Sequence, residues 1–188
     1  MGSALPKGLG KMAAVLKLND EKLKELLDRA GEFGIVEGAN FNCPGQVVIS
    51  GENKAIDEAV KIAKELGGLG IPLNVSGPFH SSLLEPASEE FYNTIKTVEI
   101  KELNKVVYSN VKGIPYEKED DIKDLLKKHI RTSVLFEKTI NHMIESGVDT
   151  FIEVGPGKAL RGFVKKINKN SKLLNVENIE SLQLTINS

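Results

Sequence analysis

The residue in this sequence that is best suited to acid–base chemistry is a histidine in a short loop. His80 follows Gly77-Pro78-Phe79 and precedes two serines. Histidine exchanges protons near neutral pH, and a loop directly behind a strand holds such a side chain on a rigid edge. A lone loop histidine is more often a packing residue than a catalytic one. The motifs around His80 therefore decide how it is interpreted.

Two asparagines form a second candidate site. Asn40 and Asn42 are two residues apart on a predicted strand over residues 34–42, so their side chains share one face. The turn Cys43-Pro44-Gly45 then leads into a second predicted strand over residues 46–50. Two interpretations stay open for the pair: contact with a polar ligand, or turn chemistry, because asparagine is common next to Pro-Gly. Cys43 is interpreted as a small turn residue.

A glycine-rich string, Gly155-Pro156-Gly157-Lys158, resembles a phosphate-binding loop at first sight. It lacks both the spacing of such loops and the serine or threonine that follows their lysine. It stands between an apolar run over residues 150–154 and a helical pattern that ends at Ile167. It is therefore predicted to be a tight strand-to-helix turn.

The charge balance argues against nucleic-acid and membrane partners. Among 188 residues, 25 lysines and arginines stand against 26 aspartates and glutamates, which leaves a net charge of −1. No basic stripe stands out, and no apolar run approaches the roughly 18 residues that a membrane span needs. The single cysteine excludes an intrachain disulfide and a cysteine-based metal cluster. The expected compartment is the reducing cytoplasm.

The first 76 residues alternate strand and helix patterns. Residues 1–10 are predicted to be a loop or tail, and strands are predicted over residues 12–16, 34–42, 46–50 and 71–75. Asn19 is a predicted helix cap, and two amphipathic helices follow the first and third strands. Their apolar stripes are Leu23, Leu26, Leu27 and Ala30, and Ile56, Ala59, Val60, Ala63 and Leu66. The order β-α-β-β-α-β is the ferredoxin-like arrangement.

The second half predicts an incomplete α/β layer. Helices are predicted over residues 81–97, 120–131, 136–144 and 160–167, and strands over residues 106–109, 150–154 and 173–176. A parallel sheet that is buried on both faces normally has more strands than these. The second half is therefore predicted to be part of a larger sheet.

Three strings, in this order and spacing, resemble malonyl-CoA:acyl-carrier-protein transacylases of bacterial fatty-acid synthesis. They are the stretches Asn40 to Gly51, Gly77 to Ser82 and Glu153 to Lys158. The resemblance covers residues 1 to about 179. It implies an α/β fold in which a ferredoxin-like subdomain, residues 11–77, is inserted into an α/β-hydrolase-like acyltransferase core. Residues 78–188 would be the C-terminal portion of that core.

The resemblance implies that His80 is the catalytic histidine. In the family this residue takes the proton of a serine nucleophile and returns it to the leaving coenzyme A thiolate. His129 stands where the family usually has glutamine, whose backbone carbonyl orients the catalytic histidine. A carbonyl does not depend on side-chain type, so a histidine is compatible with this role. A helix-packing histidine is the alternative.

The same resemblance places Asn40, Asn42 and Gln46 near the substrate. Phe79 stands where a bulky aromatic goes with malonyl and a small residue with methylmalonyl, because the ring occupies the space of an α-methyl group. An ordinary core aromatic is an equal alternative for Phe79, since one methylene is worth only about 1–3 kcal/mol of discrimination.

The family's reaction also needs parts that this sequence lacks. It contains no Gly-His-Ser-x-Gly elbow for the serine nucleophile. The family's Gly-Gln-Gly oxyanion loop and its malonyl-binding arginine are missing too. We expect a C-terminal part whose missing N-terminal segment carries these groups, and a chain that is inactive alone. The implied partners are malonyl-CoA and acyl carrier protein, with no metal and no cofactor beyond the substrate's coenzyme A thioester.

Other classes of function stay open. The chain could be a non-catalytic module that binds carrier protein or acyl-CoA, or half of a split acyltransferase. A weaker alternative is the acyltransferase domain of a larger synthase, against which the family-like C-terminus argues. A reading frame upstream of Met1 that encodes Gly-His-Ser-x-Gly and an Arg-Gly would favour the enzyme.

Overall fold

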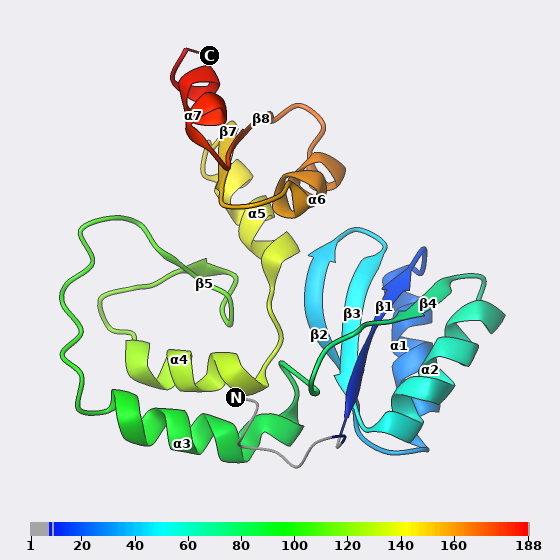
Figure 1. Ribbon diagram of the computed structural model, residues 1–188. Coiled ribbons are helices and arrows are strands. Elements are labelled where there is room, and N and C mark those ends of the chain that lie inside the picture. Colours follow the sequence, from blue (N-terminus) through cyan, green and yellow to red (C-terminus); the bar gives the residue numbers. More distant parts are fainter. Residues whose placement is uncertain (1–7, 9, 188) are drawn as a thin grey trace.

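The computed structural model describes residue 8 and residues 10–187. Its first half is a four-stranded antiparallel sheet with two helices on one face (Figure 1). The strands are β1 (Lys11–Leu16), β2 (Val36–Cys43), β3 (Gln46–Gly51) and β4 (Leu69–Pro72), and the helices are α1 (Asp20–Gly31) and α2 (Asn53–Glu65). The strand order β2-β3-β1-β4 is that of the predicted ferredoxin-like arrangement. Of the tail predicted for residues 1–10, residues 1–7 and 9 lie outside the described residues.

Most fully buried apolar side chains lie between this sheet and its helices. α1 begins after Asn19, whose side chain accepts a hydrogen bond from the Lys22 amide at 3.0 Å, as the predicted cap requires. The cluster combines Leu23, Leu26 and Ala30 of α1, Ile56, Ala59, Ile62 and Ala63 of α2, and Ala13, Val15, Val47 and Ile49 of the strands. Burying one such leucine or isoleucine stabilises the fold by about 1.5–3 kcal/mol. We expect Leu26→Ala to destabilise it by about 2–5 kcal/mol.

The other face of the sheet carries a smaller apolar cluster. Met12, Ala39 and Val48 are buried there, and Phe79 packs against them from the chain that follows β4. This packing holds the residues just before His80 against the sheet.

The second half begins with a helix pair. A 3₁₀ turn, η1 (Ser82–Leu84), leads into α3 (Glu85–Ile95), which packs along α4 (Ile122–Arg131) (Figure 1). Between them in sequence lies a short hairpin of β5 (Tyr108–Ser109) and β6 (Ile114–Pro115). The rest of the chain forms α5 (Phe136–Glu145), α6 (Ala159–Ile167), α7 (Ile179–Ile186) and the parallel strands β7 (Thr150–Val154) and β8 (Lys172–Val176).

A short extended segment after α4 joins the two halves. The Val134 amide donates a hydrogen bond to the Ala39 carbonyl at 2.8 Å, and the Phe41 amide donates to the Val134 carbonyl at 2.9 Å. The Ser133 hydroxyl donates to the Gly38 carbonyl at 2.6 Å. The segment therefore lies along the edge of β2, where Asn40 and Val134 form a parallel bridge. This brings the C-terminal end of α4 next to the sheet.

The α/β fold class is as predicted, but some elements differ. The strand predicted over residues 106–109 does not join the parallel layer, because Tyr108 and Ser109 pair with Pro115 and Ile114 in a hairpin of their own. Val106 is 76% exposed, so this β-branched run is not a core strand. β4 ends at Pro72 rather than at residue 75. α7 was not predicted from the sequence.

Candidate functional site

His80 lies in a tight turn that follows the sheet. Its φ of +58° is in the left-handed region, which non-glycine residues rarely adopt. The buried Pro78 occupies space that Gly10 leaves open, because a Cβ at Gly10 would collide with the Pro78 ring. The Ser81 hydroxyl donates to the Pro78 carbonyl at 2.7 Å and closes the turn. Unusual backbone conformations of this kind cluster at functional sites.

The ring of His80 is held by the end of α4. Its Nδ1 atom lies 3.0 Å from the backbone carbonyl oxygen of His129. A carbonyl oxygen only accepts hydrogen bonds, so Nδ1 carries the proton and Nε2 of the neutral ring keeps its lone pair. α4 ends at Arg131, so the His129 carbonyl is one of the last four carbonyls, which have no intrahelical partner. The structure thus contains the contact that the resemblance implied; the catalytic roles of both residues stay predictions.

The side chain of His129 also lies against His80. The two rings are stacked with centroids 5.4 Å apart and planes inclined by 25°. The amide Nδ2 of Asn110 lies 3.2 Å from His129 Nε2 and can only donate, so Nε2 accepts. Burial lowers the pKa of His129 from its ordinary value, and the neighbouring His80 lowers it further. The site therefore favours a neutral His129 ring beneath His80.

Asn40 lies on the sheet face that Phe79 covers. It pairs with Val48, and directly paired residues of antiparallel strands share a face. Val48 belongs to the apolar cluster against which Phe79 packs. Asn42 falls in an irregularity of β2 between Phe41 and Cys43, which the sequence did not predict. Phe79 therefore has a packing role, and substrate contact by Asn40, Asn42 and Phe79 stays a prediction.

Gln46 lies at the end of β3 that is away from the His80 turn. It begins β3, whose other end, at Ser50, pairs with Glu37 beside the His80 turn. The four residue steps of strand from Gln46 to Ser50 span about 13 Å. The Gln46 side-chain oxygen accepts a hydrogen bond from Lys166 Nζ at 2.8 Å and lies 3.9 Å from Cys43 Sγ. The structure does not bring Gln46 together with His80, and its predicted substrate contact remains untested.

Cys43 is a buried free thiol at the end of β2, directly before the hairpin turn. Burial raises its pKa, and Glu137 raises it further against the opposing effect of Lys166. A raised pKa keeps the sulfur protonated at neutral pH, so it is a poor nucleophile. The predicted position in the turn is wrong, because Cys43 ends β2 and the turn is formed by Pro44 and Gly45.

Sequence reasoning missed two polar residues of the site, Glu37 and Asn110. Glu37 Oε2 accepts a hydrogen bond from the Ser82 amide at 2.7 Å, two residues beyond His80. Asn110 supports the His129 ring and accepts, through its backbone carbonyl, a hydrogen bond from the Leu135 amide at 2.9 Å. Both residues act across long sequence separations. No local motif in the sequence marks either of them.

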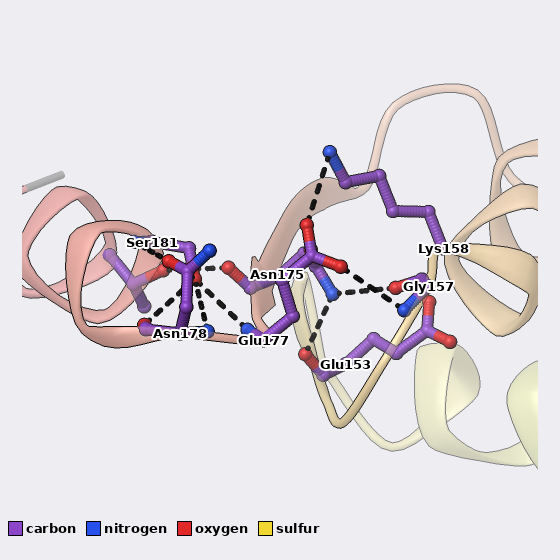
Figure 2. Close-up of polar contacts among 8 residues, drawn as sticks. Glu153, Gly157, Lys158, Asn175, Glu177, Asn178 and Ser181 are labelled. Carbon is purple, nitrogen blue, oxygen red and sulfur yellow. Dashed lines mark hydrogen bonds and ion pairs between the residues drawn. The ribbon is translucent and has the colours of Figure 1, made fainter.

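The string Gly155-Pro156-Gly157-Lys158 is a strand-to-helix turn, as predicted (Figure 2). The Asn175 side chain, nearly fully buried, donates to the Gly157 carbonyl at 2.9 Å, and Glu177 Oε2 accepts from the Gly157 amide at 3.1 Å. Lys158 Nζ lies 3.7 Å from Glu177 Oε1. The Glu153 carboxylate accepts from the first amides of α6. Since a carboxylate already occupies this helix start, the turn is not arranged as an anion site.

The described residues contain neither a metal cage nor a membrane helix. Within residues 8 and 10–187, no group of three or more histidine, cysteine, aspartate or glutamate side chains is placed to hold a metal ion. No helix in this part of the chain is long and apolar enough to cross a membrane.

The fold and the His80 turn agree with an acyltransferase. The family model for the acyl transferase domain matches residues 4–184, so the chain belongs to this family. This confirms the family to which the three strings point.

Within the family, the chain is similar to malonyl CoA-acyl carrier protein transacylases. The one of Bacillus subtilis strain 168 is 45% identical over 188 residues, which cover 99% of this chain and 59% of the relative. A solved structure from Clostridium perfringens is 51% identical with a TM-score of 0.97, covering 100% of this chain and 59% of that one. A malonyl-transacylase solved with its type II PKS acyl-carrier protein is 30% identical with a TM-score of 0.94, covering 98% and 60%. The chain thus spans about three fifths of these relatives.

Proposed function

We propose that this chain is part of an S-malonyltransferase of fatty-acid biosynthesis. The enzyme would move malonyl from coenzyme A to the phosphopantetheine thiol of acyl carrier protein. The similarity to transacylases that are named for these two substrates supports the proposal. The proposal includes no metal and no prosthetic group, because coenzyme A enters as part of the substrate. A cytoplasmic location belongs to the proposal as well.

His80 acts as the general base in the proposed reaction. Its Nε2 lone pair takes the proton of a serine hydroxyl as that oxygen forms a bond to the malonyl carbonyl carbon. The carbon–sulfur bond then breaks, and the proton passes to the coenzyme A thiolate. In the second half-reaction the base takes the proton of the phosphopantetheine thiol, and the thiolate attacks the malonyl carbonyl carbon. The ester bond to serine then breaks, and the protonated base returns the proton to the serine oxygen. This sequence of steps is a ping-pong mechanism.

The contact between His80 and His129 is the observation that carries this assignment. A hydrogen bond from Nδ1 to a carbonyl leaves Nε2 as the basic atom. The same carbonyl lies at the C-terminal end of α4 and holds the ring in this orientation.

The serine nucleophile has to come from outside the 188 residues in this proposal. Ser81 is buried and its hydroxyl is committed to Pro78, so it is not available for attack on a thioester. Ser82 lies at the start of η1, without the strained elbow that exposes a catalytic hydroxyl. Cys43 is disfavoured by its raised pKa. We therefore expect that the chain alone transfers no malonyl groups.

Radiolabelled malonyl-CoA and holo carrier protein test the proposal. The chain alone should give no labelled carrier protein above a blank without enzyme. A chimera that joins the chain to the part of the Bacillus subtilis relative it does not cover should label the carrier. Circular dichroism and gel filtration establish first that the chimera is folded and monodisperse.

Two outcomes would contradict the proposal. Turnover by the chain alone would mean that its nucleophile lies within these residues. A folded chimera that binds malonyl-CoA or carrier protein without transferring the acyl group would favour the non-catalytic binding module. Activity restored by mixing the chain with the separate segment would identify a split acyltransferase.

A further inference from the structure

We propose that Glu37 is a positioning residue that holds His80 in its left-handed conformation. The inference rests on the proposed function only in taking His80 as the base. Glu37 has no part in the resemblance from which the site was first predicted. Its carboxylate contacts the backbone of the His80 turn rather than the ring.

The conformation of His80 needs support from its surroundings. A φ of +58° is disfavoured for a residue with a Cβ, and it persists only where neighbouring contacts fix the chain on both sides. On the N-terminal side, Pro78 is wedged beside Gly10 and receives the hydrogen bond from Ser81. These contacts hold Pro78 and Ser81 on either side of His80, but they do not involve the backbone of Ser82, where the chain enters η1.

Glu37 holds the next residue, Ser82, where the chain enters η1. The first residue of η1 is Ser82, and the residue before it, Ser81, stands at the cap position. A serine there usually accepts a hydrogen bond from the helix start, but the Ser81 side chain makes no such bond. Its hydroxyl donates to Pro78 instead. The Ser82 amide is therefore left to Glu37 Oε2, which accepts it at 2.7 Å from a strand 45 residues earlier.

A carboxylate suits this position for two reasons. Its hydrogen bond to an amide is charge-assisted and stronger than one to a neutral acceptor. The Glu37 carboxylate also lies at the start of η1, which leads into α3, and the peptide dipoles there favour a negative charge. Glu37 comes from β2, the edge strand of the sheet, where it pairs with the buried Ser50 of β3.

Loss of this contact would free the chain two residues beyond His80. Residue 80 could then relax toward negative φ, and its ring would leave the His129 carbonyl. The expected result is loss of the single Nδ1–H tautomer, since a free imidazole exchanges between both tautomers. Glu37 touches no reacting atom in this account, so it acts only through His80.

Nuclear magnetic resonance of the ¹⁵N-histidine-labelled chain tests the inference without any turnover. The chain has only three histidines, so their ring signals can be resolved. In the unsubstituted chain, His80 should show one hydrogen-bonded Nδ1–H. Glu37→Leu should lose that signal, and Glu37→Gln, which keeps an acceptor oxygen, should retain it.

Glu52→Leu is the matched control. Glu52 Oε2 accepts a hydrogen bond from the Ile35 amide at 2.8 Å, a bond of the same kind that does not touch the His80 turn. It should leave the His80 signal in place. Amide exchange in β1 and β3 reports in parallel whether the sheet stays folded.

Three results would overturn the inference. The His80 Nδ1–H signal could stay unchanged in Glu37→Leu, or it could be lost in Glu52→Leu as well. It could also be lost in Glu37→Leu only when the amides of β1 and β3 lose their protection from exchange. If Glu37→Leu does not fold, Glu37→Ala is measured in the same way and judged by the same criteria. Because no step depends on malonyl transfer, failure here is distinct from failure of the proposed function.

Discussion

The Nδ1 atom of His80 and the backbone carbonyl of His129 meet at 3.0 Å, although 49 residues separate them in sequence. The meeting depends on the segment over residues 132–134, which lies along β2 and holds the end of α4 against the sheet. The acceptor is a backbone atom. The contact therefore does not require any particular side chain at position 129.

We expect His80→Ala to slow malonyl transfer by the chimera about 10²–10⁴-fold, as is typical when a general base is lost. His129→Gln keeps the carbonyl and should stay within a few fold of the unsubstituted chimera. The measurement is kcat/KM for transfer to carrier protein. Near-normal transfer by His80→Ala would remove this residue from the mechanism.

Phe79 is expected to influence selectivity against an α-methyl group. Phe79→Ser in the chimera should raise kcat/KM for methylmalonyl-CoA relative to malonyl-CoA by up to about 10–100-fold, the range that one methylene allows. Phe79→Leu is the control, since it keeps most of the packing against Met12, Ala39 and Val48. An unchanged ratio in Phe79→Ser would leave the ring as plain packing.

The ferredoxin-like half could be predicted because its signals are local. Asn19 caps a helix three residues before its amide partner, and the stripe of Leu23, Leu26 and Ala30 repeats at helical spacing. The second half carries weaker signals. α7 places Ile179 and Ile186 on the surface, 75% and 73% exposed, so its apolar residues follow no buried stripe. The β-branched pair Val106-Val107 suggested a strand that tertiary structure does not use.

The site could be predicted only in part, because its contacts are long-range and involve the backbone. His80 stood out through its motif, and His129 only through the resemblance. In the sequence, Glu37 looks like any other carboxylate on a strand. Only the fold shows that the Ser81 hydroxyl bonds to Pro78 and that the Ser82 amide donates to Glu37. Gln46 belongs to the same motif as Asn40 and Asn42, but its side chain contacts Lys166 rather than the residues of the His80 turn. Proximity in sequence did not mean proximity to His80.

Residues 11–77 are expected to be more stable than the rest of the chain. The larger apolar cluster lies wholly within them, whereas Val154 of β7 is 78% exposed. Native-state hydrogen exchange should give amides of β1, β3 and α2 at least about tenfold greater protection than those of β7 and β8, or about 1.4 kcal/mol. Equal protection in both halves of a monodisperse monomer would contradict this expectation.

We expect His129 to make the chain less stable as the pH is lowered below the ordinary pKa of histidine. Burial, with a smaller effect of His80, lowers the pKa of His129 in the folded chain. Between that lowered pKa and the ordinary value of about 6.5, the unfolded chain binds more protons than the folded one. The contribution of a neutral His129 is therefore complete above about 6.5 and is lost as the pH falls toward the lowered pKa.

His129→Gln isolates this contribution because glutamine does not titrate. The difference in unfolding free energy between the unsubstituted chain and His129→Gln should be constant from pH 8 to about 7. Below about pH 6.5, the unsubstituted chain should lose stability relative to His129→Gln as the pH is lowered. The slope should be at most about 1.4 kcal/mol per pH unit, the limit for one proton. Urea denaturation followed by circular dichroism at each pH measures it. Glu137, whose pKa burial raises, is present in both proteins, so its opposite pH dependence cancels. A difference that stays constant down to pH 5 would mean that His129 titrates alike in the folded and unfolded chains, and the neutral ring beneath His80 would lose its physical basis.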